Sequence, residues 1–285
     1  MIGERRRGKE ILTLSRVLIF REPGVYKMPV DIQIRKLTKQ FGGLKAVSEL
    51  GFELYQGELL GLIGPNGAGK TTVFNLITGL LKPNAGQILF HGQNIAEWAP
   101  HLISACGIAR TFQNIRLMPG MTVRENIRPA FHQKISYSLL SSIARTSAFI
   151  KAENEMNQKI DEVLNMLQIS EYTDHYVEDL PYGIQRRIEI ARALCLEPAV
   201  LLLDEPTAGL NQKEAKDIVE VIKHLSNENN ISIIVIEQNM RVIMSICNRI
   251  IVINQGQLIS SGTPEEIQQD KEVIRVYLGE KRIAG

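Results

Sequence analysis

The sequence has few of the features that mark secreted, metal-binding or repetitive proteins. It contains 3 cysteines, Cys106, Cys195 and Cys247, whose wide separation fits neither a disulfide framework nor a metal-ligand spacing. We therefore expect them to be small buried side chains in a reducing compartment. The 5 histidines show no ligand spacing either, and the chain has no internal repeat and no low-complexity segment. These absences argue against a disulfide scaffold and against a metal centre built from cysteine or histidine.

The chain also lacks an apolar run long enough to cross a bilayer. The longest run near the N-terminus, Ile11–Phe20, is interrupted by Arg16 and has about half the length of a membrane span. The three arginines at 5–7 precede this run as they would in a signal peptide, but no clear small-residue cleavage site follows. We expect residues 1–29 to be a poorly ordered N-terminal extension, and Met28 is an alternative start of translation.

The chain also has no large excess of positive or negative charge, since its formal net charge is only +2. Basic side chains outnumber acidic ones in residues 1–28, and the remainder has a slight excess of acidic ones. A protein that acts on phosphate backbones more often has a clustered basic stripe on its folded part. We therefore expect no nucleic-acid partner. The 285 residues, 44% of them hydrophobic, are ample for one domain core with a sizeable subdomain.

The most informative motif is at residues 64–72, which match the phosphate-binding pattern G-x-x-x-x-G-K-[ST]. It follows the apolar run Leu59–Ile63 and precedes the helix-compatible segment Val73–Thr78, which is the context that the motif needs. The loop's glycines let backbone N–H groups approach a phosphate chain, Lys70 can reach the β- and γ-phosphates, and Thr71 can ligate Mg²⁺. The chain is thus predicted to bind a nucleoside triphosphate. The loop residues expected to contact it are Gly64, Pro65, Asn66, Gly67, Ala68, Gly69, Lys70, Thr71 and Thr72.

A second part of the phosphate site is expected after the apolar run Ala199–Leu203, where Asp204 and Glu205 follow. Ligands collect at the carboxyl ends of parallel strands in such sheets. We expect Asp204 to ligate Mg²⁺ directly or through water. Glu205 is expected to orient the water that attacks the γ-phosphate, or to accept its proton. An acidic pair in this place can also simply cap the next helix, an alternative that the phosphate loop makes much weaker.

Hydrophobic patterning predicts an α/β fold. Residues 31–54 alternate apolar with polar side chains, which is typical of half-buried strands and predicts a small antiparallel sheet over the nucleotide site. Near-continuous apolar runs predict central parallel strands covered by helices at Ala199–Leu203, Ile231–Ile236 and Ile250–Ile253. The stretch from Asn126 to Leu196 is helical in pattern and predicts an inserted helical subdomain, which we place at about residues 100–196. Pro264 is expected to open a short helix.

The order of these pieces resembles that of the ATP-binding subunit of ABC transporters over nearly the whole chain after the N-terminal extension. Residues 64–72 match the family's Walker A loop, residues 201–205 its Walker B strand, and Gln113 its Q-loop. The resemblance implies a P-loop NTPase (RecA-like) core with an N-terminal antiparallel β subdomain and an inserted α-helical subdomain. It implies an ATPase domain over residues 30–270, followed by a C-terminal helix and tail over residues 271–285.

The resemblance also implies roles for single residues. Phe41 stands where the family stacks an aromatic ring on adenine, and Gln113 would reach Mg²⁺ or water only when ATP is bound. In the family two subunits enclose ATP head to tail, so the signature segment of one faces the ATP held by the other. Here that segment consists of Tyr182, Gly183, Ile184 and Gln185. We expect Tyr182, Arg186 and Arg187 to face solvent or this partner.

A narrower resemblance is to the subunits that serve bacterial importers of branched-chain and other neutral amino acids. It rests on the segments Phe41–Val47, Arg110–Asn114, Tyr182–Arg192, Ala208–Asn211 and Val276–Glu280. It implies hydrolysis of ATP with Mg²⁺ on the cytoplasmic face of the inner membrane, together with a second ATPase subunit, two membrane permease subunits and a solute-binding protein. Alternatives are an ATPase for another cargo such as lipid, a soluble ABC-type protein of translation or DNA repair, and a catalytically weak regulatory nucleotide-binding partner.

Three substitutions depart from the general family pattern. Gln238 occupies the place of the switch histidine, Pro181 that of the signature serine, and Asn211 that of the aspartate after Walker B. Glutamine can donate a hydrogen bond to the γ-phosphate but cannot become a cation near neutral pH. Gln238 would weaken the site on this chain's own P-loop and Pro181 the site on its partner's, which predicts a pair of different chains with unequal turnover. The alternative is that Glu205 and Gln113, with the loop lysine, suffice.

Overall fold

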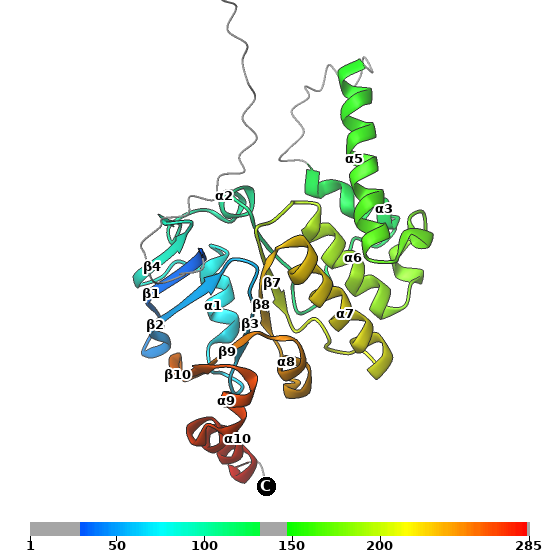
Figure 1. Ribbon diagram of the computed structural model, residues 1–285. Helices are drawn as coiled ribbons and strands as arrows, with labels where there is room; N and C mark the ends of the chain where they lie inside the picture. Colours follow the sequence, from blue (N-terminus) through cyan, green and yellow to red (C-terminus); the bar gives the residue numbers. More distant parts are fainter. Residues whose placement is uncertain (1–28, 132–146, 284–285) are drawn as a thin grey trace, which may run out of the picture.

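Two β-sheets and the helices around them make up the computed structural model, which describes residues 29–131 and 147–283 (Figure 1). The antiparallel sheet has the order β2-β1-β4-β5, with strands β1 Val30–Phe41, β2 Leu44–Tyr55, β4 Ala85–Phe90 and β5 Gln93–Asn94. The larger sheet has the order β10-β9-β3-β8-β7-β6, with strands β3 Leu59–Ile63, β6 Ile108–Arg110, β7 Val200–Asp204, β8 Ser232–Ile236, β9 Arg249–Asn254 and β10 Gln257–Gly262. The predicted N-terminal extension lies outside the described residues except for its last position.

The helices divide between the two sides of the larger sheet. They are α1 Lys70–Ile77, α2 Pro100–Ala105, α3 Val123–Ile127, α5 Ser147–Met166, α6 Tyr182–Leu194, α7 Gln212–Asn229, α8 Met240–Ile246, α9 Pro264–Gln269 and α10 Lys271–Ile283. Short 3₁₀ turns lie at Arg128–Phe131, Ser170–Tyr172 and Val177–Asp179. In Figure 1, α3, α5 and α6 lie on the side away from the antiparallel sheet, and α1 lies between the two sheets. Among the helices of the described ranges, none combines the length and hydropathy of a bilayer span.

The central strands are buried on both faces, as their sequences predict. All five residues of β3, of β7 and of β8 are buried, and these strands pair in parallel in the order β3-β8-β7. Because successive side chains of a strand point to opposite faces, Leu203 joins the hydrophobic cluster of α6 and α7, whereas Leu202 joins that of α1 and the antiparallel sheet. The predicted α/β fold with covered parallel strands is confirmed.

The antiparallel sheet packs on α1 through the alternating apolar residues of β1. Ile32 and Ile34 belong to the same buried cluster as Phe74 and Ile77 of α1. The turn between β1 and β2 falls at Gly42, which has a positive φ of 54° and matches the turn that the sequence predicts. The hairpin therefore ends beside the start of α1, next to the phosphate loop.

The helical part of the chain begins later than the sequence predicts. The strand β6 pairs with β7 inside the larger sheet, and Ile103 of α2 and Ile108 of β6 belong to the cluster around α1. Residues 100–110 of the predicted 100–196 range therefore pack with the core sheet. The reason is that β6, at the edge of the sheet, has only three residues, a length too short to give a periodic signal. Beyond them, α3, α5 and α6 form a helical layer, as expected.

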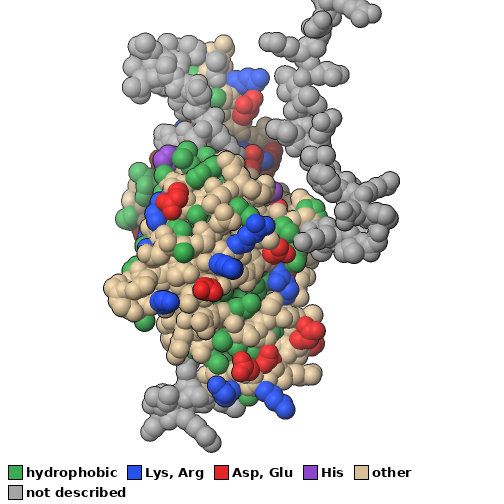
Figure 2. Space-filling model, turned by 90° about the vertical axis from the view of Figure 1, so that its left-hand side faces the viewer, with side chains coloured by type: hydrophobic (Ala, Val, Ile, Leu, Met, Phe, Trp, Pro, Cys, Tyr) green, Lys and Arg blue, Asp and Glu red, His purple; other side chains and the backbone are tan. Residues whose placement is uncertain are grey.

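The face that carries the antiparallel sheet has mixed charge. Figure 2 shows Lys and Arg side chains interspersed with Asp and Glu side chains over this face, with apolar side chains between them. Neither sign gathers into a continuous stripe on the described part of this face.

Ile234, in the middle of β8, is fully buried in the cluster shared with α1. We expect Ile234→Ala to lower the free energy of unfolding by about 2–5 kcal/mol, because it removes buried methyl groups and leaves a cavity. Urea unfolding followed by circular dichroism measures this loss. Leu258→Ala, on β10 with 42% of its surface exposed, is the control and should cost less than about 1 kcal/mol. Equal losses for the two variants would contradict the placement of Ile234.

Candidate nucleotide site

The phosphate loop connects β3 to α1, and its glycines permit the backbone path. A Cβ on Gly64 would overlap the carbonyl oxygen of Ile253, and one on Gly69 that of Ala46. Gly69 is also the N-cap of α1, with a left-handed φ of 101° that other residues rarely adopt. The loop therefore lies directly against the end of β9 and the start of β2, with its backbone N–H groups at the start of α1.

The turn between β9 and β10 also contacts the loop. The backbone N–H of Gly256 donates to the carbonyl oxygen of Ala68 at 2.9 Å, and the Gly256 carbonyl accepts from the N–H of Ser48 at 2.9 Å. A Cβ on Gly256 would lie 2.6 Å from the Ala46 oxygen, closer than packed atoms allow. One residue thus joins the phosphate loop to the antiparallel sheet.

Lys70, the first residue of α1, is buried against its own loop. Its ammonium group donates to the carbonyl oxygens of Gly64 at 2.6 Å and of Pro65 at 2.9 Å. A phosphate in the loop would compete with these oxygens for the same positive charge, because a charged acceptor binds an ammonium group more strongly than a neutral one. The phosphate contact of Lys70 stays a prediction, and its ammonium group lies against the loop that would hold the phosphate.

The loop opens onto a cleft of about 790 Å³ that brings most of the predicted site residues together. The predicted residues that line it are Phe41, Asn66, Gly67, Ala68, Gly69, Lys70, Thr71, Thr72, Gln113, Glu205 and Gln238. Phe41 lines the cleft and is 46% exposed, and the Lys39 ammonium lies 5.3 Å from its ring centre. Sequence reasoning assigned no role to Leu44, Lys45 and Gln255, which also line the cleft. Leu44 and Lys45 begin β2 close to Phe41, and Gln255 precedes Gly256 in the turn between β9 and β10; this closeness along the chain was the available signal.

Glu205 is held between two glutamine amides at the end of β7. Gln113 donates its Nε2–H to Glu205 Oε2 at 2.9 Å, and Gln238 donates its Nε2–H to Glu205 Oε1 at 2.7 Å. The backbone of Glu205 has a φ of 49°, in the left-handed region, and its N–H donates to the carbonyl of Ile236 at 2.8 Å. This conformation turns the carboxylate into the cleft. The three residues that the sequence predicts to act at the γ-phosphate therefore meet in one place.

Asp204 is paired with Arg110, which the sequence analysis did not single out. Arg110 donates from Nη2 to Asp204 Oδ2 at 2.7 Å and from Nη1 to Asn75 Oδ1 at 2.6 Å, and both members of the ion pair are almost fully buried. Burial raises the pKa of Asp204, and the hydrogen bond and charge of Arg110 oppose that shift. The guanidinium also packs at 5.3 Å from the ring centres of Phe74 and Phe112. Its only sequence signal was its place three residues before Gln113.

The donor set fits a magnesium ion held mainly by phosphates. The described residues contain no cluster of three or more His, Cys, Asp or Glu side chains that could hold a metal by themselves. The predicted ligands are instead a hydroxyl oxygen of Thr71, a carboxylate of Asp204 and an amide oxygen of Gln113. Magnesium prefers such oxygen ligands, few in number, with phosphate oxygens and waters completing its shell.

The signature segment lies at the start of α6, outside this cleft. The ring of Tyr182 packs on the loop after β7, so that a Cβ on Gly209 would lie 3.2 Å from its Cε1. Gln185 donates to the carbonyl of Leu180 at 2.9 Å. Pro181 is the N-cap of α6 and provides no side-chain cap. The structure therefore does not bring the segment to this chain's own phosphate loop.

One expectation for this helix is wrong. Arg186 does not face solvent or a partner: it is fully buried, and Arg187 is only 12% exposed. Backbone carbonyls of the adjoining Q-loop segment need hydrogen-bond donors, and Arg186 supplies them. Tyr182, by contrast, is 41% exposed.

Comparison with known proteins gives matches along nearly the whole described chain. A family described as "ABC transporter" matches residues 47–208, and one described as "Branched-chain amino acid ATP-binding cassette transporter" matches residues 257–282. The chain is 44% identical to the high-affinity branched-chain amino acid transport ATP-binding protein LivG of Escherichia coli K12, over 87% of this chain and 98% of that protein. It is 41% identical to BraF of Pseudomonas aeruginosa, a protein of the same description, with the same coverage.

Solved structures give the same picture. A nucleotide-free ATP-binding cassette from an ABC transporter matches with a TM-score of 0.76 and 29% identity, over 87% of this chain and 98% of that chain. An ATP-binding cassette in its ADP conformation matches with a TM-score of 0.77 and 30% identity, over 88% of this chain and 99% of that chain. The arrangement of sheets and loop seen here is thus that of nucleotide-binding cassettes.

Lys70→Ala should greatly weaken ATP binding, because it removes the only charge that the predicted phosphate loop itself supplies to the triphosphate. Losing a hydrogen-bonded charge costs about 2–5 kcal/mol, or roughly 30- to 5,000-fold in Kd. Isothermal titration with ATP and Mg²⁺ measures the change. Lys271→Ala, at the exposed start of α10, serves as the control and should bind as the unchanged chain does. Unaltered affinity in Lys70→Ala would place the phosphates elsewhere.

Proposed function

The chain is an ATP-hydrolysing subunit of the ABC transporter family, and we propose that it powers the import of branched-chain or other neutral amino acids. The observation that carries the catalytic part is the position of Glu205, held by Gln113 and Gln238 at the wall of the phosphate-loop cleft. The cargo rests on the similarity to LivG and BraF, whose descriptions name branched-chain amino acid transport. Transport of another cargo and a role in translation or DNA repair are not favoured by these relatives.

In the proposed mechanism, the triphosphate lies in the loop and the Lys70 ammonium moves from carbonyl oxygens to phosphate oxygens. A magnesium ion supplies further positive charge when bound, with Thr71, Asp204 and Gln113 as its protein-side ligands. Glu205 orients the attacking water and accepts its proton, and its two amide donors keep the carboxylate directed at that water. Phe41 stacks on the adenine.

The second ATPase subunit completes each site. The N-terminus of α6 carries no side-chain cap, so its first backbone N–H groups and the positive end of the helix dipole are suited to a phosphate on a partner. Pro181 contributes no hydroxyl to that contact, and Gln238 contributes a neutral donor in place of a cation. We propose that the partner is a different chain and that the two sites turn over at unequal rates.

The remaining partners follow from the same proposal. The chain docks on two permease subunits at the cytoplasmic face of the inner membrane, and a solute-binding protein delivers the amino acid to them. Hydrolysis then separates the ATPase subunits, because the γ-phosphate that joins them is lost.

The function is tested by purifying the tagged chain from membranes and reconstituting the complex in vesicles. We expect two permease subunits and a second ATPase to copurify, and ATP inside the vesicle to drive uptake of leucine in the presence of the solute-binding protein. Glu205→Gln should bind ATP with unchanged affinity yet abolish uptake and retain a closed pair of ATPase subunits, because the base is missing. Uptake of leucine at the normal rate by Glu205→Gln would reject the catalytic assignment. Copurification with ribosomes or DNA would reject the transport assignment.

Gln238→His tests whether the glutamine weakens this site. We expect the variant to raise ATP turnover of the complex, up to about 10²-fold if the wild-type site lacks one effective donor. ATP affinity should remain within about 3-fold, because the change affects the transition state more than the bound ground state. Turnover is measured by phosphate release from the purified complex. An unchanged or lower rate would show that the amide suffices, and that the unequal-site proposal is wrong.

A further inference from the structure

Among the described residues, Arg186 has the largest fully buried side chain, and it lies on α6 at the contact with the Q-loop segment. Its Nη1 donates to the carbonyl of Phe112 and to Glu189 Oε2, both at 2.8 Å, and its Nη2 donates to the carbonyl of Gln113 at 2.8 Å. Arg186 and Glu189 both have fully buried side chains. Glu189 Oε1 in turn accepts the backbone N–H of Arg116 at 3.0 Å. A buried ion pair on α6 therefore fixes the backbone on both sides of the Gln113 side chain.

The same hydrogen bonds continue to the catalytic carboxylate. The carbonyl of Gln113 accepts from Arg186, and the side-chain amide of Gln113 donates to Glu205. At the other end, the Tyr182 hydroxyl, in the first turn of the same helix, lies 3.5 Å from Arg186 Nη2. An unbroken set of contacts thus runs from the predicted signature segment to Glu205, through one guanidinium and one carboxamide.

Stability alone does not explain this pair. Taking two charges out of water costs several kcal/mol for each, and apolar replacements of similar volume often leave stability unchanged or raise it. A guanidinium differs from an apolar side chain in the fixed directions of its N–H groups, which here meet two carbonyls and one carboxylate. The pair instead holds the backbone of the Q-loop segment around Gln113 in one position.

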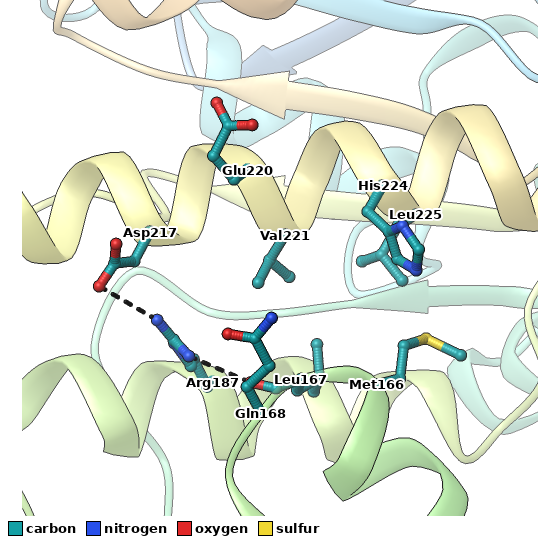
Figure 3. A pocket seen from close by; sticks show the side chains of 9 residues that line it. All are labelled: Met166, Leu167, Gln168, Arg187, Asp217, Glu220, Val221, His224 and Leu225. Carbon is teal, nitrogen blue, oxygen red and sulfur yellow. Dashed lines mark hydrogen bonds and ion pairs between the residues drawn. The ribbon is translucent and has the colours of Figure 1, made fainter.

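The neighbouring Arg187 offers a contrast on the same helix. Figure 3 shows its guanidinium directed at Asp217 of α7, in a pocket that residues at the end of α5 and on α7 also line. It donates to the carbonyl of Leu167 at 3.1 Å and pairs with Asp217 at 3.3 Å. Arg187 thus joins α6 to the end of α5 and to α7, through Leu167 and Asp217.

We propose that Arg186, oriented by Glu189, is a positioning residue for ATP hydrolysis. It fixes the backbone of Gln113 so that the Gln113 amide reaches Glu205, and it thereby makes the geometry of the base depend on the position of the signature helix. When a nucleotide bound by the partner attracts the start of α6, the hydrogen bonding of Glu205 in this chain changes. The inference rests on the proposed role of Glu205 as the base.

The test is a double-mutant cycle in the full chain, purified in its complex from membranes. The variant pair Arg186→Met with Glu189→Gln removes both charges together and keeps an acceptor for the Arg116 N–H. We expect it to lower kcat by about 10²-fold, the effect of losing one positioned group, with KM for ATP changed by less than about 3-fold, because the loop that binds ATP is untouched. In a Gln113→Ala background, the same pair should lower kcat further by less than about 3-fold, since groups that act through one another are not additive.

Arg187→Met is the matched control. It should change kcat by the same small factor in the presence and in the absence of Gln113, because its contacts are separate from the Q-loop. Arg186→Lys, which keeps the charge but offers fewer fixed donors, should fold cooperatively in a thermal melt and give an intermediate kcat. This second variant keeps the test decisive should the neutral pair fail to fold.

The outcomes separate this inference from the proposed function. Normal turnover by Glu205→Gln would overturn both. If Glu205→Gln is inactive but the neutral pair lowers kcat by the same factor with and without Gln113, Arg186 is merely structural and only the inference made here is overturned. Loss of ATP affinity in step with kcat would overturn it too, because a positioning role leaves binding intact.

Discussion

Parallel pairing of β3, β8 and β7 is the constraint on which the site depends. Parallel strands end at the same edge of a sheet, so the segments that follow these three strands meet there. The phosphate loop follows β3, and Gln238 comes two residues after β8. The strand β7 ends at Asp204, and Glu205 follows it directly. Strands that are buried on both faces fix this register firmly, because a slip would carry each side chain to the other cluster. The positions of the predicted catalytic groups are thus set by the buried apolar residues of the strands.

Lys70, Asp204 and Glu205 each already have a protein partner. Lys70 is bonded to carbonyl oxygens, Asp204 to Arg110, and Glu205 to two amides. Buried charges without partners would be costly, so these pairings stabilise the chain by itself. A nucleotide with its metal offers stronger partners to the same groups. On the proposed function, binding would be an exchange of partners within an arrangement that is already in place.

The sequence predicted the parts of this site whose signals are local. The loop at residues 64–72 is a contiguous pattern, and the apolar runs before it and before Asp204 show which strands are central. Arg110 and Arg186 were not predicted in their roles, because an arginine in a sequence carries no mark of burial: what buries it is a carboxylate or a carbonyl that folding brings from elsewhere. The strand β6 was missed for a related reason, since three residues cannot display a period. Contacts between segments that are far apart in the sequence can be identified only in the folded structure.

The contact between Gly256 and the phosphate loop has a consequence for how the C-terminal part of the chain can vary. The segment matched by the branched-chain cassette family begins at residue 257, directly after this turn. Its first strand therefore follows a turn that is hydrogen-bonded to the predicted phosphate loop. Exchanging C-terminal modules between related cassettes would be tolerated only when the junction preserves the turn and its glycine. We expect sequence variation among related cassettes to begin at β10, and Gln255 and Gly256 before it to vary little.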